Sequence, residues 1–369
     1  MESPLNATEM VSVVIPAFNA AEFIETTIAS IRQQSYRPIE VVVVDDGSSD
    51  RTAEIVESLR EEWMAEGSRL RLIHQPENRG GAAALARGFS EARGAYLCWL
   101  SSDDAFVGTA KLAEQVAQLR KHPGVSYAEA FYQGPDPAVL TDDQLVVARW
   151  HATRRSINTI MERWHAARLV GLLFRVPING STVMIDRQTW TRCGNFDPVL
   201  RNIDQDSDMW LRYSALGVRI APIREPAGFY RIHPGQTSNL RVDCIVGAAA
   251  TRIRLLRALE ESGRLARLLS RTWPVLALAY RHGWHRDRPI VASYLAERGL
   301  ALSRNPLVRY WLDRINTSIE AERLVDADLS RAAREKADDY RDSGEFSDFE
   351  ARLSRLPHHH SRRGSRVGG

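Results

Sequence analysis

The sequence is poor in cysteine and almost free of lysine. Its three cysteines, Cys98, Cys193 and Cys244, form no Cys-x-x-Cys pair and leave one unmatched, which argues against a disulfide framework and favours a reducing cytoplasm. Three of the 49 basic residues are lysine and the other 46 are arginine. Because a GC-rich genome also produces such a skew, the arginine content alone predicts no class of partner.

Long uncharged runs are also missing. The longest, 10–21, has twelve residues and contains Pro16, whereas a membrane-spanning helix needs about 20. The first ten residues have neither a basic start nor an apolar segment, so the sequence predicts no secretory signal. These absences predict a cytoplasmic protein, for which any membrane contact would be peripheral, at the inner face of the plasma membrane.

The net charge of +3 is divided unequally along the chain. Residues 1–240 carry 25 basic and 29 acidic side chains, whereas residues 241–369 carry 24 and 17. The second part is therefore basic, which permits attraction to an anionic surface. It has neither an aromatic platform nor a helix-turn-helix pattern, so no nucleic-acid partner is expected.

The segment 40–50, EVVVVDDGSSD, is the most informative stretch of the chain. Four consecutive valines without polar alternation predict a strand that is covered on both faces, as in a parallel sheet. Asp45 and Asp46 follow at its carboxyl end, where open α/β sheets bind their ligands. The same pattern also suits a plain turn in which residues 48–50 cap the next helix.

Three further strands are predicted at 11–15, 70–74 and 96–100, with helices between them. Pro16 should end the first strand, and Asn19 should cap the helix after it. Strands that alternate with helices form right-handed βαβ units, so all four should lie parallel and share one carboxyl edge. That edge collects four polar loops, two of which contain adjacent aspartates: 16–19, 45–50, 78–81 and 101–104.

Beyond residue 178 the sequence predicts a strand at 179–185, a helix at 186–193 and a second helix that begins near Met209. Aspartates at 204, 206 and 208 precede that second helix. The helix macrodipole favours acidic residues there, so a cap explains at least one of them without any function. His233, taken alone, is more often a packed or surface histidine than a ligand.

Two common nucleotide-binding motifs are absent. RGGAAALARG follows the third strand and not the first, and it lacks the GxGxxG spacing. The sequence contains no GxxxxGK[ST]. Both the dinucleotide-binding fold and the P-loop are therefore rejected.

Seven segments between residues 10 and 240 together carry a family resemblance. In order they are VSVVIPAFNA, VVVVDDGSSDRT, NRGGAAALARG, LSSDD, GNFDP, QDSDMWLR and FYRIHPGQTS. Their order and spacing are similar to those of family 2 glycosyltransferases with the GT-A fold. The resemblance implies an α/β domain over 10–240, with a Rossmann-like, mostly parallel sheet flanked by helices. A helical region is expected over 241–356 and a disordered tail over 357–369.

This resemblance implies an inverting transferase that moves a sugar from a nucleotide-diphosphate sugar, expected to be a UDP-sugar, to an acceptor hydroxyl. Bacterial polysaccharide, glycolipid or glycoconjugate synthesis is the expected setting. The departing diphosphate needs a divalent cation, and hard oxygen ligands suit Mn²⁺ or Mg²⁺. By position, metal contacts are implied for Asp103, Asp104 and His233. Nucleotide-sugar contacts are implied for Pro16, Ala17, Phe18, Asn19, Asp45, Asp46, Gly80, Gly81, Ser102 and Asp103.

Inversion requires one base that removes the acceptor proton. Asp206 matches the family's base, with Asp204 or Asp208 as alternatives if the register differs by two, and Gln205 stands where a glutamate is usual. Two further departures concern the donor site. Ser101 replaces a frequent extra aspartate, and Leu85 replaces an arginine near the diphosphate, which puts the contacts made there in doubt.

Two other functions fit parts of the pattern. A nucleotidyltransferase would also place carboxylates and a metal at such an edge, but it would release pyrophosphate. The other alternative is a non-catalytic protein that acts through its basic helices. The joint presence of Asp46, Asp104 and Asp206 argues against it.

The basic region after residue 240 has several candidate roles. It is free to contact a saccharide, lipid-linked or peptide acceptor, a second copy of the chain, or an anionic membrane surface. Alternatively its leucines simply cover the catalytic domain. The residues of that apolar set are Leu255, Leu256, Leu259, Leu265, Leu268 and Leu269.

Overall fold

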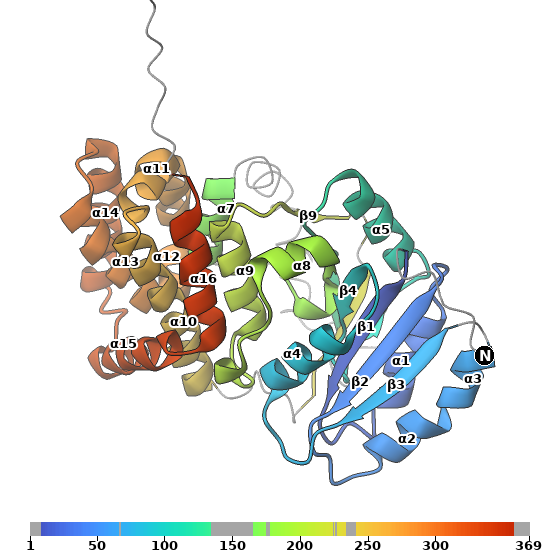
Figure 1. Cartoon of the computed structure of the whole chain (residues 1–369). Coiled ribbons are helices and arrows are strands. Elements are labelled where there is room, and N and C mark those ends of the chain that lie inside the picture. The colour runs from blue at the N-terminus through green and yellow to red at the C-terminus, as the bar shows by residue number, and fades with distance from the viewer. Residues whose placement is uncertain are drawn as a thin grey trace, which may run out of the picture.

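The computed structural model describes residues 9–65, 68–133, 165–174, 178–223, 225, 227–233 and 241–357. An α/β part that holds the N-terminal strands lies beside a stack of helices formed by the C-terminal third of the chain (Figure 1). The predicted tail, the GPDP loop and most of the segment HPGQTS lie outside the described residues.

The main sheet has seven strands, and the first four strands of the chain lie parallel, as predicted. Alternate valines of the run 41–44 belong to opposite faces of the sheet: Val42 and Val44 pack in one apolar cluster, whereas Val41 and Val43 pack in the other. The sheet is therefore covered on both sides. In spatial order its strands are β3 (Arg69–His74), β2 (Ile39–Asp45), β1 (Val11–Ala17), β4 (Tyr96–Trp99), β8 (Met184–Asp186), β6 (Val125–Tyr127) and β9 (Ile220–Pro222).

Helices between these strands cover both faces of the sheet. One of them approaches the strands very closely, because a Cβ on Gly88 would come within 2.3 Å of Val14 and 3.0 Å of Val44. Only glycine permits that distance. The helices are α1 (Ile24–Arg32), α2 (Thr52–Ser58), α3 (Arg60–Ala65), α4 (Gly81–Glu91) and α5 (Lys111–Lys121).

A second, three-stranded sheet was not predicted. Its order is β5 (Ala105–Phe106), β10 (Gly228–Arg231) and β7 (Ala130–Gln133). β10 pairs antiparallel with β5, so that Phe229 lies opposite Ala105. Since β5 follows the loop 101–104 directly, this pairing brings residues near 231 next to the second pair of aspartates.

β1 continues beyond its predicted end. Pro16 does not terminate this strand but lies inside it, opposite Val44 of β2. The odd-numbered residues of β1 bond to β2, since the carbonyl of Ala17 accepts from the N–H of Asp46. The backbone of Pro16 is directed instead to the side of β4, but β4 ends at Trp99 and does not reach this position. The missing N–H of Pro16 therefore deprives no strand carbonyl of a hydrogen bond.

Three other local predictions are wrong. Asn19 does not cap α1, whose N-cap position is Phe23; the Asn19 side chain accepts instead from the N–H of Ser49. The predicted strand at 179–185 is mostly a 3₁₀ turn (Gly180–Thr182), because the Asn179 side chain accepts from the N–H of Ser181. The helix expected near Met209 begins four residues earlier, as α9 (Gln205–Ala215).

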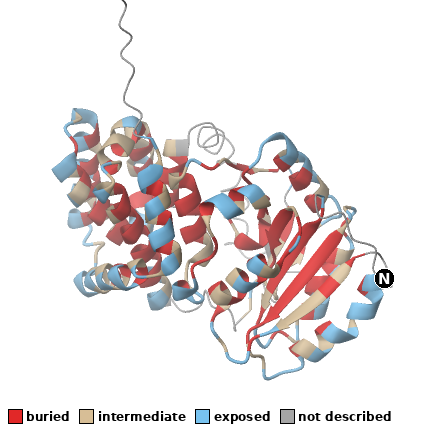
Figure 2. Ribbon diagram, viewed as in Figure 1, coloured by how far each residue is buried: buried red, intermediate tan, exposed pale blue. Residues whose placement is uncertain are grey.

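The helical stack continues the core of the α/β part. One apolar cluster extends from Val44 of β2 through Trp210 of α9 to Leu256 and Phe349, and Figure 2 shows the helices buried along their inner faces. Among the leucines singled out above, all but Leu268 are buried. No helix in the described part of the chain is long and apolar enough to cross a membrane.

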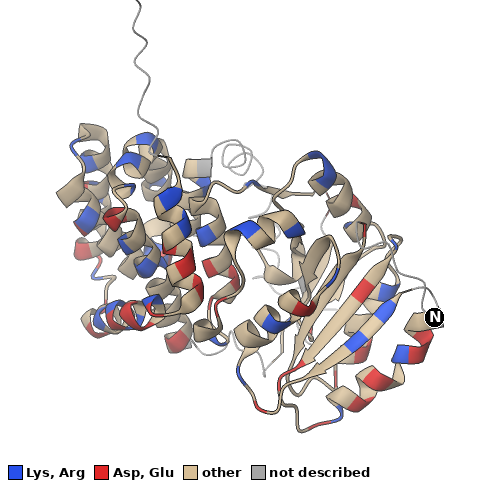
Figure 3. Ribbon diagram, viewed as in Figure 1, with Lys and Arg blue, Asp and Glu red and all other residues tan. Residues whose placement is uncertain are grey.

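Three helices lead from the sheet into the stack: α7 (His165–Phe174), α8 (Arg187–Cys193) and α9. The stack itself comprises α10 (Arg241–Glu261), α11 (Leu265–Arg281), α12 (Trp284–Asp287), α13 (Pro289–Leu302), α14 (Pro306–Ala321), α15 (Ala327–Arg341) and α16 (Gly344–Arg355). Acidic and basic side chains alternate along α15 and are not separated into one basic face (Figure 3).

Candidate functional site

A cavity of about 1150 Å³ opens at the carboxyl edge of the parallel strands. The loops after β1, β2 and β4 form one wall, and β10, the start of α9 and α10 form the other. Most of the predicted site residues line this cavity: Pro16, Ala17, Phe18, Asn19, Asp46, Gly81, Ser102, Asp103, Asp104, Asp206 and His233. Asp45 and Gly80 are not part of its wall.

Asp46 holds the loop between β3 and α4. Its buried carboxylate accepts hydrogen bonds from Gln75 Nε2 at 2.8 Å, the N–H of Arg79 at 2.9 Å and the N–H of Gly80 at 2.7 Å. The nucleotide-sugar contact predicted for this residue would have to share a carboxylate that already has three protein donors. Asp46 therefore has a structural role, in holding residues 75–80 in place, as well as a position in the cavity wall.

Asp45 and Asn19 stabilise the neighbouring loops. Asp45 is fully buried, accepts from the N–H of Ser48 at 3.1 Å and lies 2.9 Å from His74 Nδ1. The Asn19 N–H donates to Ser48 Oγ, and Asn19 Oδ1 accepts from the N–H of Ser49, both at 2.9 Å. These bonds tie the loop after β1 to the loop after β2, which fixes one wall of the cavity.

Asp103, Asp104 and His233 come together at the end of β4. His233 Nε2 lies 2.9 Å from Asp103 Oδ2. Asp104 is buried and accepts from Ser181 Oγ at 2.5 Å and from the N–H of Arg231 at 3.2 Å. Burial, followed by the negative charge of Asp103, raises the pKa of Asp104 to about 7. The charge of Arg231, whose Nε donates to the carbonyl of Asp103 at 3.0 Å, acts in the opposite direction.

These residues fit a divalent cation whose shell is completed by the substrate. The described residues contain no group of three or more His, Cys, Asp or Glu arranged to enclose a metal. Mg²⁺ commonly uses one or two carboxylates together with substrate phosphates and water, so a pair such as Asp103 and Asp104 suffices. Ser101 has no carboxylate to offer. Its N–H donates to Ser181 Oγ at 3.1 Å, and Ser181 in turn holds Asp104.

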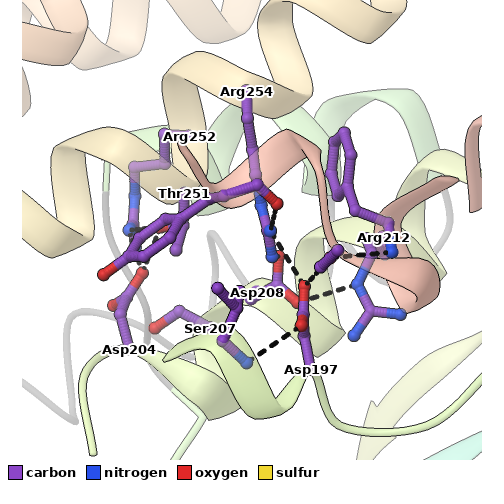
Figure 4. Close-up of polar contacts among 12 residues, drawn as sticks. Asp197, Asp204, Ser207, Asp208, Arg212, Thr251, Arg252 and Arg254 are labelled. Carbon is purple, nitrogen blue, oxygen red and sulfur yellow. Dashed lines mark hydrogen bonds and ion pairs between the residues drawn. The ribbon is translucent and has the colours of Figure 1, made fainter. Parts of the chain in front are cut away.

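The three aspartates at the start of α9 have different surroundings, and Figure 4 shows two of them, Asp204 and Asp208, beside their arginines. Asp204 Oδ2 lies 2.6 Å from Arg252 Nη1. Asp208 is buried against Arg212 at 2.7 Å and Arg254 at 2.6 Å. Burial alone would raise the pKa of Asp208, but these two arginines lower it.

Asp206 lines the cavity and, within the described part of the chain, makes no ion pair. Its Oδ1 accepts only from Ser207, at 2.7 Å from the backbone N–H. Burial, followed by the charge of Asp204, raises the pKa of Asp206 to about 6. This carboxylate is therefore ionised at neutral pH and still a better proton acceptor than an ordinary aspartate, a property that Asp208 lacks.

A helix cap explains none of these side-chain positions. Asp204 occupies the N-cap position with a left-handed φ of 58°, but its side chain makes no capping hydrogen bond and points to α10 instead. The capping role expected for at least one aspartate is thus wrong for the N-cap residue, because an ion pair with Arg252 takes its place. The macrodipole still favours the carboxylates in the first turn.

The sequence is similar to known glycosyltransferases over this same region. Residues 12–172 match the model of the family described as Glycosyl transferase family 2. The amylovoran biosynthesis glycosyltransferase AmsB of Erwinia amylovora is 42% identical over 224 residues, which are 60% of this chain and 69% of AmsB. The chain belongs to glycosyltransferase family 2.

Other family 2 relatives match over shorter parts. Glycosyltransferase GlyG of Streptococcus pneumoniae is 40% identical over 98 residues, 26% of this chain and 31% of GlyG. The chain thus spans only about a third of that relative. In fold, S. aureus TarS 1-349, crystallised with UDP-GlcNAc, superimposes with a TM-score of 0.52 at 17% identity, over 85% of this chain and 91% of that one.

Several residues of this family 2 site were missed by sequence reasoning. Ser181 orients Asp104, and Arg252 and Arg254 neutralise the aspartates beside Asp206. Arg288, from the loop before α13, reaches the cavity wall. One signal was readable: the run ATRIRLL of α10 places two arginines among apolar residues, as in a buried helix that must find acidic partners.

Proposed function

We propose that this protein transfers a sugar from a nucleotide-diphosphate sugar, with a UDP-sugar as the expected donor, to an acceptor hydroxyl with inversion. One observation carries the proposal: a single cavity gathers Asp46, the Asp103/Asp104/His233 cluster and Asp206, which has no ion pair among the described residues. These residues come from separate segments of the chain, so a purely structural turn or cap does not account for their convergence.

The donor would lie along the sheet edge. Residues 16–19 would wall the nucleobase, and Asp46 would keep the adjacent loop in place. Asp103, Asp104 and His233 would hold the cation at the diphosphate. A bound divalent cation supplies positive charge to the leaving diphosphate.

Asp206 would act as the base. As the acceptor oxygen forms its bond to the anomeric carbon, the bond from that carbon to the diphosphate oxygen breaks, and the acceptor proton passes to the Asp206 carboxylate. A single displacement from the opposite face inverts the anomeric centre. A base with a pKa of about 6 is well matched to neutral pH.

The setting follows from the relatives. AmsB is named for amylovoran biosynthesis, and it is similar to this chain over 224 residues. We therefore propose a growing saccharide of a polysaccharide or glycolipid as the acceptor class. The division into a catalytic part at 10–240 and a helical region at 241–356 is retained as a working boundary, although the two share one core.

A thermal shift experiment on the full chain tests the donor. UDP, GDP and their sugars would each be added with Mn²⁺, and the fitting nucleotide at 100 times its dissociation constant stabilises the folded state by about 2.7 kcal/mol. EDTA should abolish both the shift and the turnover, and Asp104→Ala should weaken nucleotide binding. Full activity in excess EDTA would contradict the cation site, and release of pyrophosphate would identify a nucleotidyltransferase instead.

A further inference from the structure

Arg288 brings a positive charge from the helical stack to the wall of the cavity. It lies between α12 and α13, immediately before Pro289, and its side chain is half-buried. The cavity wall beside it includes Asp204, Asp206 and Cys244. No motif in the sequence singles it out, because Arg288 lies 50 residues beyond Ser238, the end of the last motif that resembles the glycosyltransferase family.

The carboxylates around Arg288 do not neutralise it. Asp204 is already paired with Arg252 at 2.6 Å. Arg288 itself makes no hydrogen bond or ion pair with the described residues. Burial and the nearby charge of Arg252 lower its pKa to about 10, even though Asp204, Asp287 and Asp206 act in the opposite direction.

Arginines elsewhere in the stack behave differently. Arg298 pairs with Glu260, and Arg341 pairs with Glu261 and Glu350. In both, hydrogen bonds to glutamate raise the pKa of the guanidinium. Arg288 differs from both: it is half-buried, and the described residues offer its five N–H donors no acceptor. A partly desolvated cation without a hydrogen-bond partner is costly, so such a group at a cavity wall suits an anionic ligand.

The position of Arg288 identifies which substrate it would meet. Arg288 shares the cavity wall with Cys244 and Ala248 of α10, the helix that pairs with Asp204 at the start of α9 through Arg252. Asp104 instead lies against β10, where it accepts from the N–H of Arg231. Arg288 therefore belongs to the end of the cavity where the acceptor hydroxyl would lie, and not to the cation end. We propose that Arg288 binds a carboxylate or phosphate group on the acceptor saccharide, so that this enzyme selects an anionic acceptor.

This inference rests on the proposed function, because it takes Asp206 to mark the acceptor side. Guanidinium groups bind carboxylate and phosphate through paired N–H donors, so the same site suits either anion. Glucose, glucuronate and glucose 6-phosphate differ only at carbon 6, and they separate a neutral, a carboxylate and a phosphate ligand. The comparison within this set cancels every contact made by the rest of the ring.

The experiment measures dissociation constants of these three sugars by calorimetry, with the full chain saturated with UDP and Mg²⁺. At least one anionic sugar should bind about 10- to 100-fold more tightly than glucose, as expected for a hydrogen bond to a charged group. Arg288→Gln should remove this difference, and Arg288→Lys should keep part of it. Arg286→Gln is the matched control, since Arg286 is exposed, pairs with Glu322 and lies outside the cavity wall.

Three results would overturn the inference: equal binding of all three sugars to the wild type, an anion preference that survives Arg288→Gln, or a loss of UDP affinity in Arg288→Gln that matches the loss of sugar affinity. The last would make Arg288 a donor residue. UDP affinity of the wild type is measured separately. If the wild type binds no nucleotide, the proposed function is wrong. A preference for anionic sugars that depends on Arg288 would still support the anion site, independently of that result.

Discussion

The two acidic clusters of the cavity are neutralised very differently. Near Asp103 and Asp104 lie the imidazole of His233, 2.9 Å from Asp103 Oδ2, and Arg231, whose Nε donates to the carbonyl of Asp103 and not to a carboxylate. Asp204 and Asp208 have three arginines, and only Asp206 between them is left without an ion pair in the described part of the chain. Positive charge thus reaches the first cluster from one histidine and one arginine, whereas arginines pair directly with both aspartates that flank Asp206 in the second.

The arginines of the second cluster come mostly from α10. Arg254 joins Asp208 at 2.6 Å and Asp197 at 2.9 Å, and all three side chains are buried. The carbonyl of Tyr340 also accepts from Arg254, and Ser343 Oγ donates to Asp197. The helical stack therefore helps to build the site. Its removal should disrupt the second cluster, which depends on Arg252 and Arg254, much more than the first.

The largest expected effect comes from ending the chain at residue 240. Such a chain loses Arg252 and Arg254, leaves Asp197 and Asp208 without these partners, and exposes the apolar surface that α10 covers. We expect it to be insoluble or unfolded, as measured by circular dichroism and gel filtration. A folded fragment that still binds nucleotide would show that the stack serves the acceptor or a surface and is dispensable for folding.

Breaking a single link of the second cluster should come next. Arg254→Met leaves two buried carboxylates short of a counterion, and removal of one partner from a buried ion pair costs about 3–5 kcal/mol of unfolding free energy. Denaturant unfolding measures this. Arg257→Met is the matched control on the same helix: its partner Asp338 is exposed, so we expect a loss of less than about 1 kcal/mol.

Asp206→Asn should leave the fold intact and stop the chemistry. The amide keeps the shape of the side chain but accepts no proton, so transfer should fall by about 10²- to 10⁴-fold. Nucleotide affinity should hold, because the donor end of the cavity is untouched. Asp204→Asn and Asp208→Asn are the controls and should act through stability. If either is inactive yet stable while Asp206→Asn is fully active, the base has been assigned to the wrong carboxylate.

The smallest effect concerns pH and stability. Because burial raises the pKa of Asp206 above its value in the unfolded chain, the folded state binds the proton more tightly, and the ionised carboxylate costs stability at neutral pH. This cost disappears as pH falls through about 6 toward the ordinary aspartate value. Asp206→Asn should therefore melt at a higher temperature than the wild type at pH 7 and at nearly the same temperature at pH 4. An equal melting temperature at pH 7 would show that Asp206 is well compensated.

Local sequence patterns predicted the first half of the fold and most of the cavity wall. The valine run and the adjacent aspartates are local signals, and both strand ends lie at the predicted edge. The contact of His233 with Asp103 depends on the pairing of β10 with β5, which are more than 120 residues apart and have no pattern in common. Pro16 was misjudged because its effect depends on where a neighbouring strand ends, which periodicity does not reveal.

The partners of Asp206's neighbours could not be predicted either. An arginine in a helix has the same pattern whether it faces solvent or a buried aspartate, so Arg252 and Arg254 were counted only as basic charge. Their role as partners of Asp204 and Asp208 becomes visible when α10 is packed against α9. The spacing of apolar residues therefore predicted that leucines such as Leu255 and Leu256 are buried. The aspartates that pair with Arg252 and Arg254 could be identified only from the tertiary structure.

The link from Asp197 through Arg254 to Tyr340 and Ser343 also has a consequence during synthesis. The N-terminal half of the chain leaves the ribosome first, when Asp197 and Asp204 have no arginine of α10 to pair with and must stay hydrated. The groups that complete this link become available only when nearly the entire chain has emerged. We therefore expect a nascent or prematurely terminated chain to lack an ordered carboxylate at Asp206, and so to be inactive in transfer even where part of it has folded.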